Sequence, residues 1–202
     1  MKKFFASALI GFALITPSFT QANEGFYVGA QGGGNFLKSR YLAERHCVFD
    51  TGYVAGAVGG YYLRPELRLE GEINYHRNDY RLHGLGSDGS KTTFHGDINT
   101  WSFMANGYFD IPICLFECVM PYIGAGIGYD TLHQKITVEG HHYKGNNTGF
   151  AWQLMSGLNF RVFEDVDLFV GYEFHETPLR SGHKLQNQSA ILGIRKLFDF
   201  CY

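Results

Sequence analysis

The stretch Leu67-Arg68-Leu69-Glu70-Gly71-Glu72-Ile73-Asn74-Tyr75 decides the fold. Its odd positions are apolar or small, whereas its even positions are charged or polar. An α-helix would spread this period of two around its whole circumference, but an extended strand places each set of side chains on its own face. The stretch therefore predicts a β-strand whose two faces meet different surroundings.

Further segments repeat this pattern or have strand-like composition, and turn residues or polar stretches separate them. Including the first stretch, the sequence predicts eight strands, at residues 23–36, 52–63, 67–80, 97–111, 121–135, 149–162, 166–176 and 188–202. The connections between them alternate in length. Those after the second and sixth strands are tight, and residues 112–120 form a connection of intermediate length. The long, polar connections are Leu37–Asp50, Arg81–Gly96, Ile136–Thr148 and Thr177–Asn187.

Long connections at one end and short turns at the other are typical of an outer-membrane barrel, whose long loops face outward and whose turns face the periplasm. The N-terminus agrees with export. Met1-Lys2-Lys3 precedes an apolar run from Phe4 to Ile15, and Thr20-Gln21-Ala22 has the small-x-small form of a cleavage site. We therefore predict a signal peptide at residues 1–22 and one barrel domain at residues 23–202.

Composition excludes other classes. No segment after the signal reaches the run of about 18 apolar residues that a transmembrane helix needs. Of 17 lysines and arginines, Lys2 and Lys3 lie in the signal, which leaves 15 basic against 19 acidic side chains. This excess of negative charge argues against a nucleic-acid partner.

A sheet that spans lipid must pair all its backbone groups, so it has to close. We expect an all-β fold, an eight-stranded antiparallel up-and-down transmembrane β-barrel whose interior is just filled by side chains. Its outward face would carry leucine, isoleucine, valine, phenylalanine and glycine, with tyrosine and tryptophan near the strand ends. Because buried charges must be paired, we also expect an interior ion-pair network. Its predicted members are Arg68, Glu70, Glu72, Arg161, Glu173 and Arg195.

Four cysteines follow the signal. An exported protein can form disulfides, and we expect one among Cys114, Cys118 and Cys201, with Cys47 as the odd thiol. The spacing Cys114-x-x-x-Cys118 also fits half a zinc site, but no second His or Cys pair lies nearby in sequence. We therefore predict no metal at this position.

Five segments, in this order and spacing, resemble the small bacterial outer-membrane β-barrel proteins of the OmpA/OmpX/Opa-like surface-antigen group. They are Gly25-Phe26-Tyr27-Val28-Gly29, Leu69-Glu70-Gly71-Glu72, Met104-Ala105-Asn106-Gly107-Tyr108-Phe109-Asp110, Pro121-Tyr122-Ile123-Gly124-Ala125-Gly126-Ile127-Gly128-Tyr129 and Leu192-Gly193-Ile194-Arg195-Lys196-Leu197-Phe198. The resemblance covers essentially the whole mature chain. It implies a monomer in the outer membrane of a Gram-negative cell, in contact with lipid and lipopolysaccharide. It also implies a terminal aromatic residue, Phe198 or Tyr202, that the barrel-assembly machinery recognises.

We expect no catalysis and no cofactor. The barrel would be an anchor, and the four long connections would be displayed at the cell surface for adhesion, interaction with a host or its immune system, or envelope integrity. One alternative is a small-solute pore. Another is a lipid A-modifying enzyme, for which His175 with Glu173 or Glu176, and Ser181 or Ser189, are the candidate residues. The adjacent His141 and His142 are a weak metal signal, because polar loops commonly contain histidine.

Overall fold

The structure is a computed structural model that describes residues 25–39, 47–49, 51–85, 91–113, 119–138, 141–178 and 184–199. The predicted signal peptide, Cys114, Cys118, Cys201 and Tyr202 lie outside these residues, as do Ser181 and His183. Among the described residues, there is no helix long and apolar enough to cross a membrane.

Nine strands make up the described chain, and all neighbouring strands are antiparallel. The strands are β1 (Gly25–Ser39), β2 (Cys47–Phe49), β3 (Gly52–Arg64), β4 (Leu67–Leu85), β5 (Lys91–Asp110), β6 (Val119–Val138), β7 (His141–Phe163), β8 (Val166–Pro178) and β9 (Lys184–Asp199).

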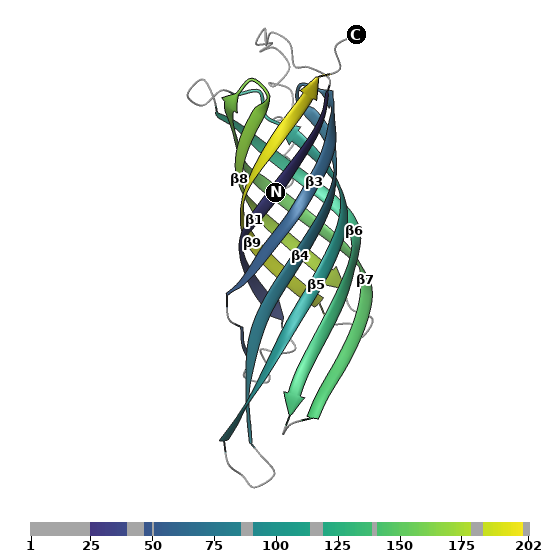
Figure 1. Ribbon diagram of the computed structural model, residues 1–202, viewed down its shortest axis with the longest axis vertical. Helices are drawn as coiled ribbons and strands as arrows, with labels where there is room; N and C mark the ends of the chain where they lie inside the picture. Colours follow the sequence, from purple (N-terminus) through teal and green to yellow (C-terminus); the bar gives the residue numbers. More distant parts are fainter. Residues whose placement is uncertain are drawn as a thin grey trace, which may run out of the picture.

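Eight of these strands close into a barrel, as the alternation predicted. Each strand pairs with its neighbour in the chain, and β1 closes the ring by pairing with β9 from Gly25↔Asp199 to Ser39↔Leu185. Figure 1 shows the strands strongly tilted around a long barrel axis, with the yellow β9 beside the purple β1. Closure leaves no unpaired sheet edge around the barrel wall, which is the condition for a sheet to lie in hydrocarbon.

At one end of the barrel, two tight turns join neighbouring strands. Pro65 and Glu66 link β3 to β4, and Glu164 and Asp165 link β7 to β8. Backbone bonds from Asp110 to Glu66 and from Leu197 to Asp165 hold these turns against the neighbouring strands. The beginning of β1 and the end of β9 lie at the same end, which we call the turn end.

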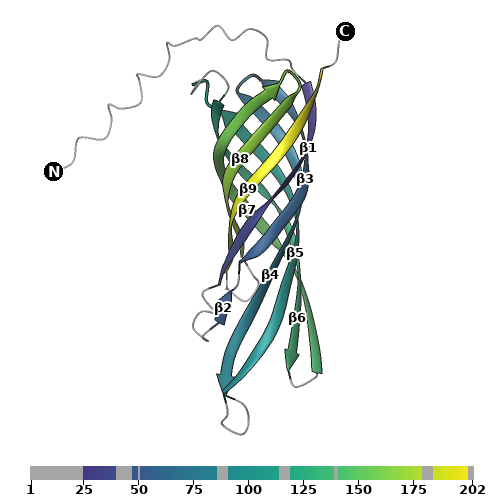
Figure 2. The ribbon, with the colours of Figure 1, turned by 60° about the vertical axis from the view of Figure 1, so that its left-hand side comes forward.

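At the opposite end, four strands continue where the others stop. The last pair between β3 and β4 is Tyr53↔Arg77, but β4 and β5 remain paired as far as Leu85↔Lys91. Likewise β7 pairs with β8 only from Trp152 onward, whereas its pairing with β6 extends to Val138↔His141. Figure 2 shows these two hairpins projecting past the rest of the barrel. We call the part of β4–β7 beyond these last pairs the projecting sheet.

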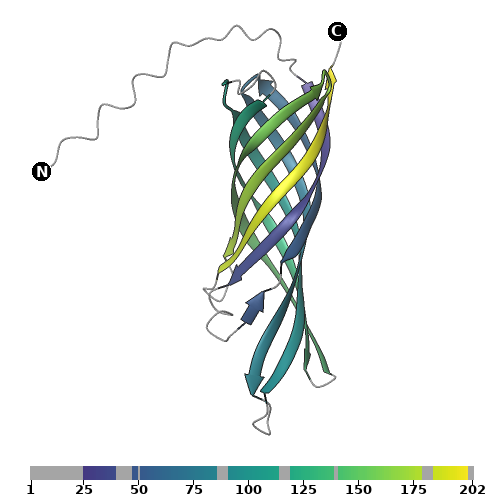
Figure 3. The same cartoon turned by 90° about the vertical axis from the view of Figure 1, so that its left-hand side faces the viewer.

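The short strand β2 was not predicted. It pairs with β4 through Cys47↔Leu82, Val48↔Arg81 and Phe49↔Tyr80. In Figure 3 it lies beside the base of the projecting sheet, just beyond the end of the barrel. Because β3 has already ended there, β2 takes over its place at the edge of β4.

The predicted long connections were wrong in extent. Most of 81–96 and 136–148 is paired strand, and Leu37–Asp50 and Thr177–Asn187 lose residues at both ends to β1, β2, β8 and β9. The prediction took polar composition as the mark of a loop. The backbone pairing between neighbouring strands continues through these segments regardless of their polar composition.

Candidate membrane surface and interior network

The outward face of the barrel is apolar. On β4, Leu67, Leu69 and Ile73 are exposed, while the alternate residues are buried. On β6 the outward Ile127 is 60% exposed, although it lies in the middle of a strand. A water-soluble barrel would put such side chains in its core, so this pattern requires an apolar solvent around the barrel.

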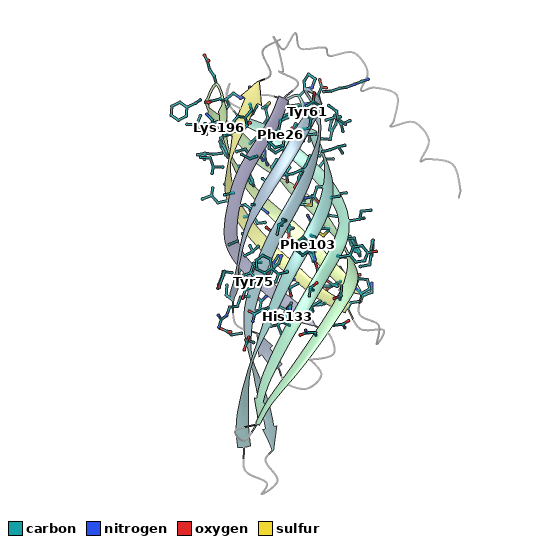
Figure 4. The ribbon with its side chains drawn as sticks, turned by 45° about the vertical axis from the view of Figure 1, so that its right-hand side comes forward. Phe26, Tyr61, Tyr75, Phe103, His133 and Lys196 are labelled. Atoms are coloured by element: carbon teal, nitrogen blue, oxygen red, sulfur yellow. The ribbon has the colours of Figure 1, made fainter. Side chains whose placement is uncertain are left out.

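Aromatic side chains border this apolar surface at both ends. Toward the projecting sheet, Tyr75 packs on Trp101 with ring centroids 5.1 Å apart, and Tyr129 packs on Phe150 at 6.3 Å. At the turn end, Phe26 packs on Phe198, also at 6.3 Å. Figure 4 shows Phe26, Tyr61 and Lys196 near one end of the outer surface, and Tyr75, Phe103 and His133 toward the other. Two aromatic girdles with an apolar band between them are the signature of a bilayer-spanning barrel.

The interior of the turn end contains an ion-pair cluster centred on Arg68, whose side chain is fully buried. Its guanidinium lies 3.1 Å from Glu70 and 3.1 Å from Asp110. It also donates to the hydroxyl of Tyr27 at 3.2 Å and stacks on the ring of Tyr108, 3.8 Å from the centroid. A guanidinium offers five donors and a flat face, so one side chain can satisfy two carboxylates and pack on an aromatic ring.

Arg195 is the second cation of this cluster. It approaches Glu70 to 3.7 Å, donates to Asn159 at 3.0 Å and stacks on Phe169 at 3.9 Å. Asn159 in turn donates to Asp110 at 2.9 Å, so the two arginines share one connected set of partners. The cluster therefore balances Arg68 and Arg195 against Glu70 and Asp110.

The other predicted network members lie elsewhere. Arg161 pairs with Asp167 at 3.1 Å, but its side chain is 46% exposed. Glu72 and Glu173 are buried without any arginine among their described partners. Of the six predicted residues, the structure thus brings Arg68, Glu70 and Arg195 together and adds Asp110. The sequence placed Asp110 on the polar face of its strand, but strand alternation gives no information about which polar residues meet across the barrel.

Glu72 is surrounded by side-chain amides. Gln31 and Gln153 donate to its carboxylate at 3.1 Å and 2.9 Å, and Asn74 and Asn106 also donate to it. These amides come from β1, β4, β5 and β7, so the carboxylate ties together strands from around the barrel. Four N–H donors can stabilise one buried carboxylate without a cation beside it.

A second polar cluster lies further from the turn end and is centred on His175. Its Nε2 is 2.8 Å from Asp130 Oδ2, and its Nδ1 is 2.9 Å from Gln153 Oε1. Thr177 also donates to Asp130, and the ring of His76 lies 5.7 Å from that of His175 between centroids. The sequence did not predict this cluster, since its members are spread over four strands.

Apolar and aromatic side chains fill the rest of the interior. Val54, Tyr108, Tyr122, Met155, Phe169 and Ile191 form a buried core. Toward the projecting sheet, Leu37, Ile98, Leu132 and Leu185 are all at most 4% exposed. Each stands two residues further from the turn end than a buried polar residue of the same strand. Side chains thus fill the barrel on both sides of the His175 cluster, as expected for eight strands.

The residues considered for catalysis are not assembled as the sequence suggested. His175 is buried and bonded to Asp130 rather than to Glu173 or Glu176. Glu176 instead pairs with Lys184 at 2.8 Å, and Ser189 donates to Asn35 at 3.2 Å. Within the described part of the chain, no three His, Cys, Asp or Glu side chains come close enough to hold a metal ion.

One ion pair lies outside the membrane-spanning strands, at the turn between β7 and β8. Asp165 there accepts a hydrogen bond from Lys196 on β9, and both side chains are about half exposed. This hydrogen bond lowers the pKa of the Asp165 carboxyl from its usual value. Lys196 also lies near the ring of Phe198, with its Nζ 6.0 Å from the ring centroid.

A closed antiparallel barrel with an apolar outer band, two aromatic girdles and a charged, filled interior defines a transmembrane β-barrel of the outer-membrane type. Comparison with known proteins agrees. The sequence model of the family described as "outer membrane protein beta-barrel domain" matches residues 5–194, so the chain belongs to this family.

Solved structures of small outer-membrane barrels are similar to the whole described fold. Neisserial surface protein A (NspA) is 21% identical, with a TM-score of 0.61 over 88% of this chain and all of that one. Ail of Yersinia pestis is 17% identical, with a TM-score of 0.54 over 87% of this chain and 99% of that one. The comparison with curated proteins gave no match.

Proposed function

We propose that this protein is a non-catalytic anchor that displays the projecting sheet at the cell surface, where the sheet binds a partner in adhesion or host interaction. The observation that carries this proposal is the continuation of β4–β7 beyond the last pairs with β3 and β8. A barrel whose only task was to span the bilayer would need no paired strand past the aromatic girdle.

The direction of display follows from the position of the two ends. The turns at residues 65–66 and 164–165 lie at the same end as Gly25 and Asp199, and the projecting sheet lies at the other end. In outer-membrane barrels the short turns face the periplasm, so we expect the projecting sheet to lie outside the cell. An epitope tag inserted between Leu85 and Lys91 should therefore bind antibody on intact cells.

Ail is the attachment invasion locus protein of Yersinia pestis. At this level of identity the similarity concerns the fold, so adhesion by this chain must be tested directly. The test is to shorten the projecting sheet while leaving the barrel intact. A two-residue Asn-Gly turn would join Asp79 to Asp97, which are cross-strand partners, and a second would join Gln134 to Gly145, also partners.

All pairs of β3 with β4 and of β7 with β8 survive both deletions. The shortened protein should therefore still insert, and its gel mobility should still change on heating. Bacteria that carry the full chain should adhere to cultured epithelial cells, whereas those with the shortened chain should not. Equal adherence of the two strains, at equal surface amounts, would refute the proposal.

The same strains test the two alternatives. The packing of Arg68, Tyr108 and Phe169 across the interior supports a closed barrel, so planar bilayers with the pure protein should show no single-channel steps. A lipid A-modifying enzyme would change the mass of lipid A when the gene is deleted. We expect the mass to be unchanged.

A further inference from the structure

The hydrogen bonds around His175 determine its charge. Both of its ring nitrogens face oxygen atoms: Nε2 faces Asp130 Oδ2 at 2.8 Å, and Nδ1 faces Gln153 Oε1 at 2.9 Å. A neutral imidazole has one N–H donor and one bare nitrogen, which needs a donor opposite it. The identity of the two facing atoms therefore decides whether His175 is neutral or charged.

The orientation of the Gln153 amide is fixed by its other end. Its Nε2 lies 2.9 Å from Glu72 Oε2 and 2.9 Å from Asn106 Oδ1. Asn106 cannot be turned over, because its own Nδ2 donates to Glu72. Turning Gln153 over would place its oxygen against two acceptors, so the amide oxygen faces His175 and Nδ1 must carry a proton.

The other nitrogen faces a carboxylate that already accepts from Thr177 at the same oxygen atom. An ionised carboxylate can only accept hydrogen bonds, so Nε2 is a second donor. We infer that His175 is a doubly protonated imidazolium. It serves as the counter-ion of the carboxylates around it, and its two hydrogen bonds hold Asp130 and Gln153 in place. This inference does not depend on the proposed function, because it concerns the interior rather than the projecting sheet.

Titratable groups from three strands face this ring. They are Asp130 on β6, Glu72 and His76 on β4, and Glu173 on β8 itself. The buried arginines Arg68 and Arg195 belong to the cluster at the turn end, where they pair with Glu70 and Asp110. A charged His175 is thus the cation that balances the carboxylates facing its ring.

The protonation of His76, whose ring lies beside that of His175, can be assigned in the same way. Its Nδ1 faces the Nδ2 of Asn35 at 3.5 Å, and the Oδ1 of Asn35 accepts from Ser189 at 3.2 Å. The amide of Asn35 therefore presents a donor to His76, whose Nδ1 is bare. Two histidines with rings 5.7 Å apart thus have opposite assignments: His175 is charged and His76 is neutral.

Loss of the proton on His175 Nδ1 would disturb the connected hydrogen bonds of Gln153, Glu72 and Asn106. A bare Nδ1 would face the oxygen of Gln153, and turning that amide would break its bonds to Glu72 and Asn106. A solvent-exposed histidine is mostly neutral above pH of about 6.5. The folded barrel would then hold one more proton than the unfolded chain above this pH, so its stability would fall as the pH rises.

The direct test is nitrogen NMR of the barrel in lipid nanodiscs at pH 7.5, with ¹⁵N-labelled histidine assigned through the backbone. His175 should show two protonated ring nitrogens, and His76 should show one bare nitrogen. A bare nitrogen in His175 would overturn the inference. No variant is required, so failure of a variant to fold cannot leave the question open.

A second measurement compares urea unfolding of the wild type with His175→Gln between pH 7 and pH 10. Glutamine can donate to Asp130 but has no proton to lose in this range. The unfolding midpoint of the wild type should fall with pH more steeply than that of His175→Gln. Parallel pH profiles of two folded proteins would contradict the inference.

Discussion

Replacing Arg68 by methionine tests the turn-end cluster most sharply. The side chain is fully buried, lies 3.1 Å from Glu70 and 3.1 Å from Asp110, and stacks on Tyr108. Methionine keeps much of the volume and contact with the ring, so the main loss is the positive charge. Two carboxylates would then share Arg195, which is 3.7 Å from Glu70.

Removing one partner from a buried ion pair costs about 3–5 kcal/mol, because the remaining charge stays desolvated. With a urea slope of about 2 kcal/mol per M, the unfolding midpoint of Arg68→Met should fall by about 2 M. Trp101 and Trp152 face outward on β5 and β7, so their fluorescence reports on transfer of the barrel from lipid to water.

Arg77→Met is the matched control. Arg77 lies 3.8 Å from Asp79, but both side chains are about half exposed or more, and such a surface pair adds little to stability. The double variant Arg68→Met with Asp110→Asn should recover part of the loss, since one uncompensated charge is removed. A loss of less than about 1 kcal/mol for Arg68→Met, equal to that of the control, would refute a dry, paired interior.

Three further predictions compare a variant with a control or with the wild type. Gly60→Ala should lower the free energy of unfolding by about 1–3 kcal/mol, because a Cβ there would lie 2.4 Å from an interior tyrosine ring. Gly59→Ala should change it by less than about 0.5 kcal/mol, since no atom lies closer than 3.9 Å to a Cβ at that position. Equal effects of the two variants in urea titrations would contradict the faces assigned to these residues. Ala105→Lys, on the lipid-facing side, should lower the free energy of unfolding by about 2–4 kcal/mol, whereas Asn99→Lys, beyond the aromatic girdle, should lower it by only about 0–1 kcal/mol. A larger loss for Asn99→Lys than for Ala105→Lys would exclude the assigned position of the bilayer. The pKa of Asp165 is lowered in the folded protein, so its ion pair stabilises the fold above the usual aspartate pKa and is lost as the pH falls through the lowered value. Asp165→Asn should flatten the stability profile in that acidic range, and an unchanged profile would show that the ion pair is without effect.

The sequence was sufficient to predict the barrel and, on β4, which side chains face outward and which face inward. On β4 the period of two puts Leu69 and Ile73 outside, and Glu70 and Glu72 inside, as the structure has them. This success has a simple cause. A strand has only two faces, and a residue in hydrocarbon must differ in chemistry from one in a polar interior.

The partners inside the barrel could not be predicted in the same way. Arg68 meets Asp110, 42 positions away, and Glu72 meets Gln153, 81 positions away. Such meetings depend on how far each strand is shifted against the next around the whole ring, and alternation within one strand contains no information about that shift. The predicted network therefore included Arg161, Glu72 and Glu173, which lie outside the arginine cluster, and lacked Asp110.

The ends of the strands were also predicted wrongly from the sequence. Residues 141–148 are mostly polar, yet they form a strand because the neighbouring chain pairs with them. Composition reports the solvent that a segment contacts, and water contacts projecting strands and loops alike. A projecting strand differs from a loop only in that a neighbouring strand pairs with it.

A nitroxide scan along residues 67–77 of β4 in lipid vesicles, after the native cysteines are replaced by serine, tests the central claim most directly. Oxygen dissolves in lipid, whereas a nickel chelate remains in water. Labels at positions 67, 69, 71, 73 and 75 should collide with oxygen and be protected from the chelate, while labels at the even positions should be shielded from both. Equal oxygen contact at odd and even positions, or contact of the odd positions with the chelate, would contradict a barrel whose apolar face is surrounded by lipid.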